Sequence, residues 1–361
     1  MLNLKSTLKI KKTVSHQSPD LDALGAIWLA KKFGQKKFSG IDKAPIEFLP
    51  GGLIMPDGRT GDDWLKDGIL VVDMGGGRFD HHQYSSKDNQ QNQRCAATLV
   101  AEFLEIREDL ALKQILQSIA INDLFGESRA MDLAHLIKDR NAIDKDPQET
   151  FAIVSQWLDD AYAAQQLFVE ALEVKSTTAI LSLTGDRKIK IATALTDNPQ
   201  AAKALRSNLK ADVVMIKNSR GNVQIFNRTV DGVQTVGFGD VVRILRYEEQ
   251  RKAGKITVTD WKLGQEKAVP GPGIELWYYL ANPRNGIEML LNGSQTVERP
   301  PTRLSEDEIM RAITIGIDQD YFCPGCNPQE CSKCEFYPYG LKRCQKKKSE
   351  RQTQRVLRKR N

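Results

Sequence analysis

The chain lacks any apolar run near the length of a membrane span, and it lacks a signal-like apolar leader. A membrane-spanning helix needs about 20 predominantly apolar residues, so the sequence predicts a protein that does not cross a membrane. No feature indicates an oxidising compartment, and disulfides are therefore not expected among the six cysteines. We expect a cytoplasmic protein.

Histidine is also scarce, and its distribution is uneven. Three of the four histidines lie in two short acidic motifs, His16-Gln-Ser-Pro-Asp20-Leu-Asp22 and Phe79-Asp80-His81-His82. Imidazole and carboxylate groups gathered in this way can bind two divalent cations, which polarise a phosphoryl oxygen and lower the pKa of water. The fourth, His135, lies in a helical apolar pattern and is expected to be a surface or packing residue.

Both motifs are predicted to lie where strands end. Residues 8–15 have the pattern of a strand, and residues 22–32 have helical apolar spacing after a turn at Ser18-Pro19. A second apolar strand, residues 68–72, ends at Asp73, and three glycines at 75–77 allow a sharp turn before the second motif. Carboxylates at the ends of parallel strands meet in the crevice where open α/β sheets bind ligands.

These motifs resemble those of the DHH phosphoesterases, a family of exonucleases, oligoribonucleases, cyclic-dinucleotide phosphodiesterases and family II pyrophosphatases. The first motif matches the family's His-x-x-x-Asp-x-Asp, Asp73 resembles its lone aspartate, and residues 80–82 match its Asp-His-His signature. Asp123, late in an expected helix, fits a fourth motif. The resemblance covers residues 8–130 and implies a parallel-sheet α/β catalytic domain.

The resemblance also implies a centre of two Mn²⁺ or Mg²⁺ ions. Its protein ligands would be His16, Asp20, Asp22, Asp73, His81 and Asp123. Asp73 would bridge the two ions, with His16 and Asp20 completing the first site and the other three residues completing the second. His82 would contact the substrate phosphate or a leaving oxygen, so His82 and Asp73 are the candidate catalytic residues.

One spacing departs from the common family pattern. Only six residues separate Asp73 from Asp80. The segment Val71-Val-Asp-Met-Gly-Gly-Gly-Arg-Phe-Asp-His-His-Gln83 resembles instead the second and third motifs of a eukaryotic branch described as exonucleases acting on RNA. The subfamily therefore stays open, while the metal-site interpretation is unchanged.

The second informative region contains most of the cysteines. Cys323-Pro-Gly-Cys326 and Cys331-Ser-Lys-Cys334 form two Cys-x-x-Cys pairs, and Cys344 follows. Two such pairs predict thiolate coordination of one metal, with zinc favoured. The pairs are closer together than in a usual zinc ribbon, so a site that includes Cys344 or an iron–sulfur cluster stays open. Cys95, at the start of an apolar helix, is expected to be a small buried residue.

Positive charge is concentrated at the C-terminus. Residues 341–361 have a net charge of +9, whereas the whole chain has +6. A cationic extension beside a metal-binding segment suits a polyanion such as single-stranded nucleic acid. The alternative is a solvated end without a partner, and the segment has no interleaved aromatic residues for base stacking.

Hydrophobic periodicity predicts an α/β protein of several parts. We expect a DHH-type catalytic domain over residues 1–180, with helices at 97–108, 109–125, 128–141 and 149–175. A smaller α/β substrate-binding domain would cover 181–300, a helix with the Cys-rich metal-binding module 301–344, and a basic tail 345–361. Ser305 and Glu308 predict a capping box. Candidate substrate-binding residues are Arg94, Arg220 and Arg243.

The leading hypothesis is a two-metal phosphodiesterase or exonuclease in which hydroxide on the metals attacks the phosphorus of single-stranded nucleic acid or short oligonucleotides. Two alternatives share this chemistry, a phosphatase of pyrophosphate or polyphosphate and a cyclic-dinucleotide phosphodiesterase. A third is a nucleic-acid-binding protein without catalytic activity. Cleavage assays discriminate among these classes.

Overall fold

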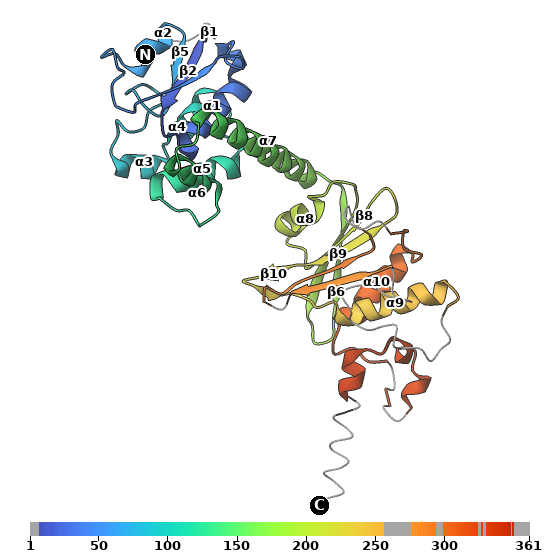
Figure 1. The fold of residues 1–361 in the computed structure, drawn as a ribbon. Coiled ribbons are helices and arrows are strands. Elements are labelled where there is room, and N and C mark those ends of the chain that lie inside the picture. The colour runs from blue at the N-terminus through green and yellow to red at the C-terminus, as the bar shows by residue number, and fades with distance from the viewer. Residues whose placement is uncertain are drawn as a thin grey trace, which may run out of the picture. The chain divides into compact units, whose positions relative to one another are not determined.

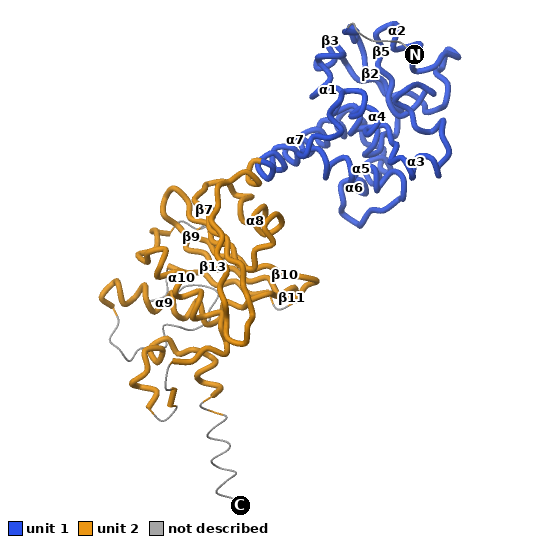
Figure 2. The backbone as a smooth tube through the Cα atoms, turned by 180° about the vertical axis from the view of Figure 1, so that it is seen from behind, with its two compact units in different colours: residues 1–169 blue, residues 170–361 orange. Residues whose placement is uncertain are grey.

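The computed structural model describes residues 7–255, 276–282, 284–293, 299–323, 326–327, 330–347 and 349 (Figure 1). The chain divides into two compact units, residues 1–169 (unit 1) and residues 170–361 (unit 2), which Figure 2 colours separately. Both units are mixed α/β. Residues 348 and 350–361, which make up most of the predicted basic tail, lie outside the described residues.

Unit 1 contains a three-stranded parallel sheet with strand order β4-β2-β5. Its strands are β2 Lys12–His16, β4 Ile46–Leu49 and β5 Ile69–Val71. A separate parallel pair joins β1 Leu8–Lys9 to β3 Phe38–Ser39. The strand predicted over residues 8–15 is therefore two strands, because its first residues pair with β3 while the later ones pair with β4 and β5.

Seven α-helices begin among the described residues of unit 1: α1 Leu21–Phe33, α2 Gly61–Lys66, α3 Ser86–Asn92, α4 Ala96–Phe103, α5 Lys113–Phe125, α6 Leu133–Ala142 and α7 Pro147–Leu172, whose last three residues belong to unit 2. Helix α1 packs against α4 and α5, and its first ten residues are all buried. The four predicted helices are present with shifted ends. The predicted helix 97–108 stops at Phe103 because Glu105 has a left-handed backbone, with φ +61°.

Unit 2 contains a six-stranded sheet with strand order β12-β13-β9-β8-β7-β6. The strands are β6 Ser176–Ser182, β7 Lys188–Leu195, β8 Val213–Lys217, β9 Val223–Asn227, β12 Tyr278–Asn282 and β13 Ile287–Leu291. Strands β7 and β8 are parallel and are connected through α8 Ala201–Leu209, whereas the other neighbouring strands of this sheet are antiparallel. A short hairpin joins β10 Thr229–Val230 to β11 Val233–Gln234.

Two helices of unit 2, α9 Gly239–Lys252 and α10 Glu306–Ile317, pack against each other. Helix α10 begins with the predicted capping box, in which Glu308 N donates to Ser305 Oγ at 3.3 Å and Ser305 N donates to the Glu308 carboxylate at 2.7 Å. The Cys-rich segment contains two 3-10 turns, η3 Cys331–Lys333 and η4 Tyr337–Tyr339. Phe336, Tyr339 and Leu341 share one hydrophobic core with the sheet and both helices.

Gly316 of α10 packs directly against Val241 of α9. A Cβ atom there would lie 2.5 Å from Val241 Cγ2 and 2.6 Å from both Cα and N of Val241. We predict that Gly316→Ala lowers the free energy of unfolding by about 1–3 kcal/mol in urea titrations, since α9 must move. Adding Val241→Ala should not restore stability, because the Val241 backbone atoms remain. Recovery in the double variant would show that the side chain alone makes the contact.

Candidate metal centre

The parallel sheet of unit 1 brings the first two candidate ligands together. His16 is the last residue of β2, and Asp73 follows β5 by two residues. The register pairs Val14 with Val71, so His16 and Asp73 fall at the same level beyond the sheet. His16 Nε2 lies 3.2 Å from Asp73 Oδ2. Asp73 has a left-handed backbone with φ +59°, and its N–H donates to Phe79 O at 2.9 Å.

Helix α1 supplies two further aspartates from its N-terminus. Asp20 is the N-cap residue, whose side chain accepts from Asp22 N at 2.9 Å and Ala23 N at 3.0 Å. The buried Asp22 carboxylate accepts from the first two amides of α4, Ala96 N at 2.6 Å and Ala97 N at 2.8 Å. Asp22 therefore connects two helices in addition to facing the candidate centre.

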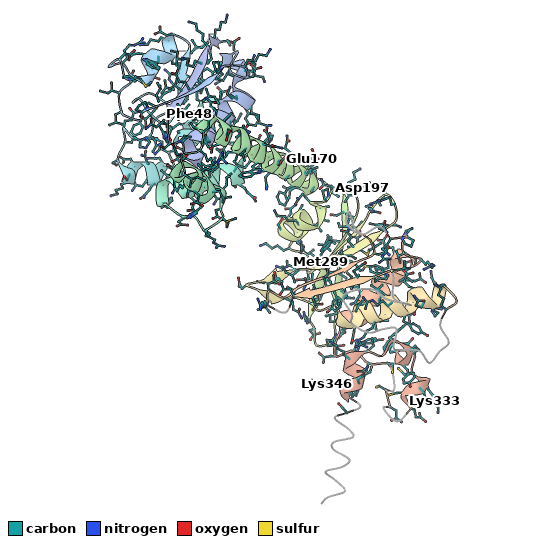
Figure 3. All side chains as sticks on the ribbon, in the orientation of Figure 1. Phe48, Glu170, Asp197, Met289, Lys333 and Lys346 are labelled. Atoms are coloured by element: carbon teal, nitrogen blue, oxygen red, sulfur yellow. The ribbon has the colours of Figure 1, made fainter. Side chains whose placement is uncertain are left out.

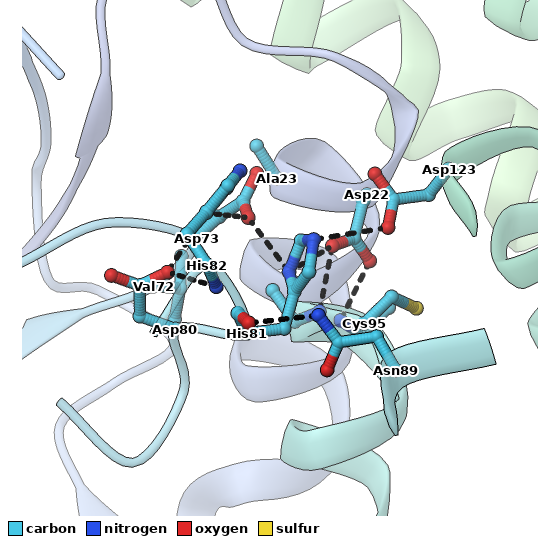
Figure 4. A network of polar contacts seen from close by, with 12 residues as sticks. Asp22, Ala23, Val72, Asp73, Asp80, His81, His82, Asn89, Cys95 and Asp123 are labelled. Atoms are coloured by element: carbon cyan, nitrogen blue, oxygen red, sulfur yellow. Dashed lines mark hydrogen bonds and ion pairs between the residues drawn. The ribbon is translucent and has the colours of Figure 1, made fainter. Parts of the chain in front are cut away.

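His81 lies among the carboxylates (Figure 4). Its Nδ1 is 3.4 Å from Asp73 Oδ1 and 3.6 Å from Asp22 Oδ2, and its Nε2 is 3.2 Å from Asp123 Oδ2. Asp123 comes from α5, and the backbone of His81 is held by Asn89 Nδ2, which donates to His81 O at 2.9 Å. The structure thus brings Asp22 of the first motif, Asp73 and His81 of the Asp-His-His motif together with Asp123 of α5.

Three of these buried polar atoms lack a well-formed hydrogen bond within the described residues. They are Asp73 Oδ1, His81 Nδ1 and Asp123 Oδ2. Buried polar atoms are paired in the large majority of cases, so three unsatisfied atoms on carboxylates and an imidazole fit a bound cation. Ligand atoms within 4.8 Å of one another form three groups that could bind a metal ion: His16, Asp20, Asp73; Asp73, His81, His82; and Asp22, Cys95, Asp123.

Burial and mutual repulsion shift the pKa values of these carboxyl groups. Burial raises the pKa of Asp22 well above its usual value, and the charges of Asp73 and Asp123 add to this effect. Burial likewise raises the pKa of Asp123 to about 6. Burial alone would also raise the pKa of Asp73, but its contacts with His16 and His81 outweigh this and lower it. Among the four candidate ligand aspartates, Asp73 is thus the one whose pKa is lowered.

The same charges act on His81 and Cys95. Burial lowers the pKa of His81, but its contact with Asp73 and the charges of Asp123 and Asp22 raise it to about 9 overall. Cys95 is fully buried, as predicted, and burial raises its pKa well above the usual value. Cys95 is therefore expected to stay protonated in the absence of a metal ion, and it lies near Asp22 and Asp123.

Asp80 has a role that the sequence did not reveal. It is buried and accepts hydrogen bonds from Gly76 N at 2.8 Å and His82 N at 3.0 Å. Its Oδ1 also lies 2.8 Å from His82 Nδ1, while the His82 side chain is 52% exposed. Asp80 therefore fixes the imidazole of His82. The one sequence feature that could have indicated this role is that Asp80 and His82 are two positions apart, which allows their side chains to contact each other.

A pocket of about 520 Å³ opens onto this arrangement. Four of its lining residues are candidate ligands or catalytic residues: His16, Asp20, Asp73 and His82. The remainder are Asp80, Gln17, Ser18, Met74 and the loop residues 51–53. Gly76 makes the adjacent turn possible, because its φ is +63° and a Cβ there would lie 2.5 Å from Leu53 O.

The three candidate substrate-binding arginines lie in different environments. Arg94 lies over the ring of Tyr84, with 4.6 Å from Cζ to the ring centroid. Arg220 is exposed and lines two pockets of unit 2, of about 450 and 640 Å³. Asp197, which also lines the first of them, is labelled in Figure 3. Arg243 is half-buried and donates to Gly340 O at 2.9 Å. Of these, only Arg94 belongs to unit 1, which contains the candidate metal centre.

Other predicted features also have defined positions. His135 is a surface residue, with its side chain 44% exposed. The five C-terminal cysteines are half-buried free thiols in unit 2. Arg343, counted in the basic C-terminal segment, is buried and pairs with Asp240 at 3.2 Å, so its charge is used within the fold. Over the described residues, no helix has both the length and the apolar character needed to span a membrane.

Comparison with known proteins adds little. No family model matches the chain, and no curated protein matches it. Among solved structures, the crystal structure of an uncharacterized protein from Helicobacter pylori G27 is similar to this chain at 13% identity and a TM-score of 0.24. The alignment covers 86% of this chain and 99% of that chain. So low a TM-score supports no conclusion about fold or function.

A divalent cation should stabilise unit 1, because it would offset the repulsion among these carboxylates. At 100 times its dissociation constant, Mn²⁺ should add about 2.7 kcal/mol to the free energy of unfolding. Asp73→Asn should abolish this gain in thermal melts, whereas Asp139→Asn on the surface of α6 should retain it. Equal stabilisation of both variants would place the bound ion elsewhere.

Proposed function

We propose that unit 1 is a two-metal phosphodiesterase that hydrolyses single-stranded nucleic acid or short oligonucleotides, acting as an exonuclease. The observation that carries this proposal is the orientation of Asp73. Its Oδ2 faces His16 at 3.2 Å, and its Oδ1 faces His81 at 3.4 Å. A carboxylate whose oxygens face two separate sets of ligands suits a bridging position between two cations.

The donor atoms suit Mn²⁺ or Mg²⁺. His16, Asp20 and Asp73 would hold the first ion, and the second would be held by Asp73 with the set Asp22, His81 and Asp123. Carboxylate-rich sites with imidazole favour hard to borderline divalent ions over thiophilic ones. Two such ions, when bound, offset charge on the phosphoryl oxygens and lower the pKa of water.

His82 is the group of the chain best placed to contact the substrate. Its Nδ1 is engaged by Asp80 at 2.8 Å, so Nε2 is the nitrogen available to a phosphate or a leaving oxygen in the pocket. The hydrogen bond that His82 donates to the Asp80 carboxylate raises the pKa of His82, although burial of the imidazole opposes this rise. A protonated imidazole there would neutralise phosphate charge and donate a proton to the leaving oxygen.

Tyr84 favours a substrate that carries a base over bare pyrophosphate. Tyr84 follows the Asp-His-His motif, its N–H donates to His81 O at 3.1 Å, and its ring is 44% exposed. The Arg94 guanidinium lies 4.6 Å from the ring centroid on one side. An exposed aromatic ring with an adjoining arginine is a common platform for stacking an unpaired base.

The direct test offers the full-length protein, with Mn²⁺, labelled RNA and DNA oligonucleotides, dinucleotides, a cyclic dinucleotide and pyrophosphate. We expect mononucleotide release that EDTA abolishes and added Mn²⁺ restores. Asp73→Asn should remove activity, and His82→Gln should lower kcat about 10²–10⁴-fold. Asp139→Asn, exposed and distant in sequence, is the matched control and should retain activity.

Other outcomes of this panel are equally informative. Phosphate release from pyrophosphate without oligonucleotide cleavage would replace the proposal with a small-anion phosphatase. Cleavage of the cyclic dinucleotide alone would indicate a signalling phosphodiesterase. Absence of turnover with every substrate and metal, together with retained nucleic-acid binding, would indicate a protein that only binds.

The stacking role of Tyr84 has a separate prediction. Tyr84→Ala should raise KM for oligonucleotides about tenfold, because stacking of one base contributes about 1–3 kcal/mol. Tyr84→Phe should behave like the wild type, since the ring is retained. Neither variant should change hydrolysis of a phosphodiester of p-nitrophenol that has no base. An equal loss on that compound would show that Tyr84 supports the metal centre instead.

A further inference from the structure

The pocket at the candidate metal centre has an apolar edge that the sequence motifs did not indicate. Most of its lining side chains are charged or polar, and Met74, which also lines it, is only 3% exposed. Leu53 differs, because it lines the pocket and is 55% exposed. The next residue, Ile54, is 62% exposed. Leu53 and Ile54 together are called the apolar rim below.

The backbone that carries the apolar rim is anchored to the parallel sheet and to the glycine turn. Gly75 N donates to Gly52 O at 2.7 Å, which joins the loop to the turn before the Asp-His-His motif. Met55, which follows the rim, is 2% exposed and packs in a small core with Val14 of β2 and Val71 of β5. Because the loop is anchored on both sides, the rim stays exposed beside the pocket and does not fold into a core.

The apolar rim and the candidate ligands suit different parts of one substrate. The imidazole and carboxylate groups of the pocket suit cations and, through them, phosphate oxygens. The side chains of Leu53 and Ile54 have no hydrogen-bonding group, so they add nothing to the binding of a bare phosphate. They favour binding only by removing apolar surface from water. An occupant that uses both the rim and the ligands has an apolar group joined to a phosphate.

We propose that the apolar rim contacts the sugar and base attached to the scissile phosphate, and that it thereby selects nucleotide esters over small phosphate anions. This inference rests on the proposed function of unit 1 and specifies part of its substrate. A nucleoside offers the rim apolar surface, whereas pyrophosphate and polyphosphate have none. Leu53 lines the same pocket as His82, whose Nε2 is available to the phosphate, while Tyr84 is not among the lining residues. The rim is therefore a contact separate from the Tyr84 ring.

The test compares p-nitrophenyl phosphodiesters that differ only in the second group on the phosphate. Two carry thymidine, attached through its 5′ or its 3′ oxygen, and the reference carries a methyl group. With Mn²⁺ and the full-length protein, Leu53→Ser combined with Ile54→Ser should raise KM for the thymidine ester that is cleaved about tenfold, because apolar burial is lost. Its kcat, and hydrolysis of the methyl ester, should stay unchanged.

Two further variants separate contact with the nucleoside from a general effect on the protein. Leu53→Met combined with Ile54→Val keeps the apolar surface and should behave like the wild type. Leu110→Ser changes another exposed leucine of unit 1, 58% exposed between α4 and α5, and should also behave like the wild type. Equal losses on the methyl and thymidine esters in the serine variant would overturn the proposal, since the rim would then support the metal centre. Unchanged KM for the thymidine ester would overturn it as well.

A binding measurement applies if neither thymidine ester is hydrolysed. Fluorescence anisotropy of a labelled single-stranded oligonucleotide, with Mn²⁺ present, should then show that the wild type binds about fivefold more tightly than the serine variant. Such a difference without hydrolysis would refute the proposed phosphodiesterase and retain the role of the rim. Equal affinity of the two proteins, or no binding by the wild type, would overturn the role of the rim.

Discussion

The repulsion among carboxylates in a small buried space is the constraint on which unit 1 depends. Asp22, Asp73 and Asp123 face His81, and Asp20 lies in a group with His16 and Asp73. Burial makes the negative charges of these aspartates more costly. Because the carboxylates repel one another, each must be held in place by the helix or strand that carries it. A positive charge is needed among them, and in the protein alone the imidazole of His81, with its pKa raised to about 9, can supply it.

The scaffold meets this constraint at three points where helices and strands begin or end. Asp20 caps α1, Asp22 accepts from the amides of α4, and Asp73 holds a left-handed backbone beyond β5. A residue with a side chain in that conformation is uncommon outside turns and functional sites. The backbone geometry thus holds these negative charges close together, whereas in water the same charges would stay apart.

Short-range patterns were enough to predict part of this arrangement. His16 and Asp73 could be placed together because each follows an apolar strand and parallel strands end at one edge. The hydrogen bonds from α4 to Asp22 could not be foreseen, because Asp22 and Ala96 lie 74 positions apart in the sequence. The pairing of Arg343 with Asp240 was missed for the same reason, and a residue counted in the cationic C-terminal segment is instead buried within the fold.

Asp22 has a consequence for how related sequences should be judged. Its carboxylate accepts hydrogen bonds from two backbone N–H groups at the start of α4. Loss of this carboxylate would leave both N–H groups buried without that partner, whether or not the protein has an activity. The side chain of His82, by contrast, is half exposed, so the fold depends less on it. If unit 1 is a hydrolase as proposed, selection for folding in related sequences that lack the activity would preserve the aspartate but not the histidine. The histidine would then be the better indicator of an active enzyme.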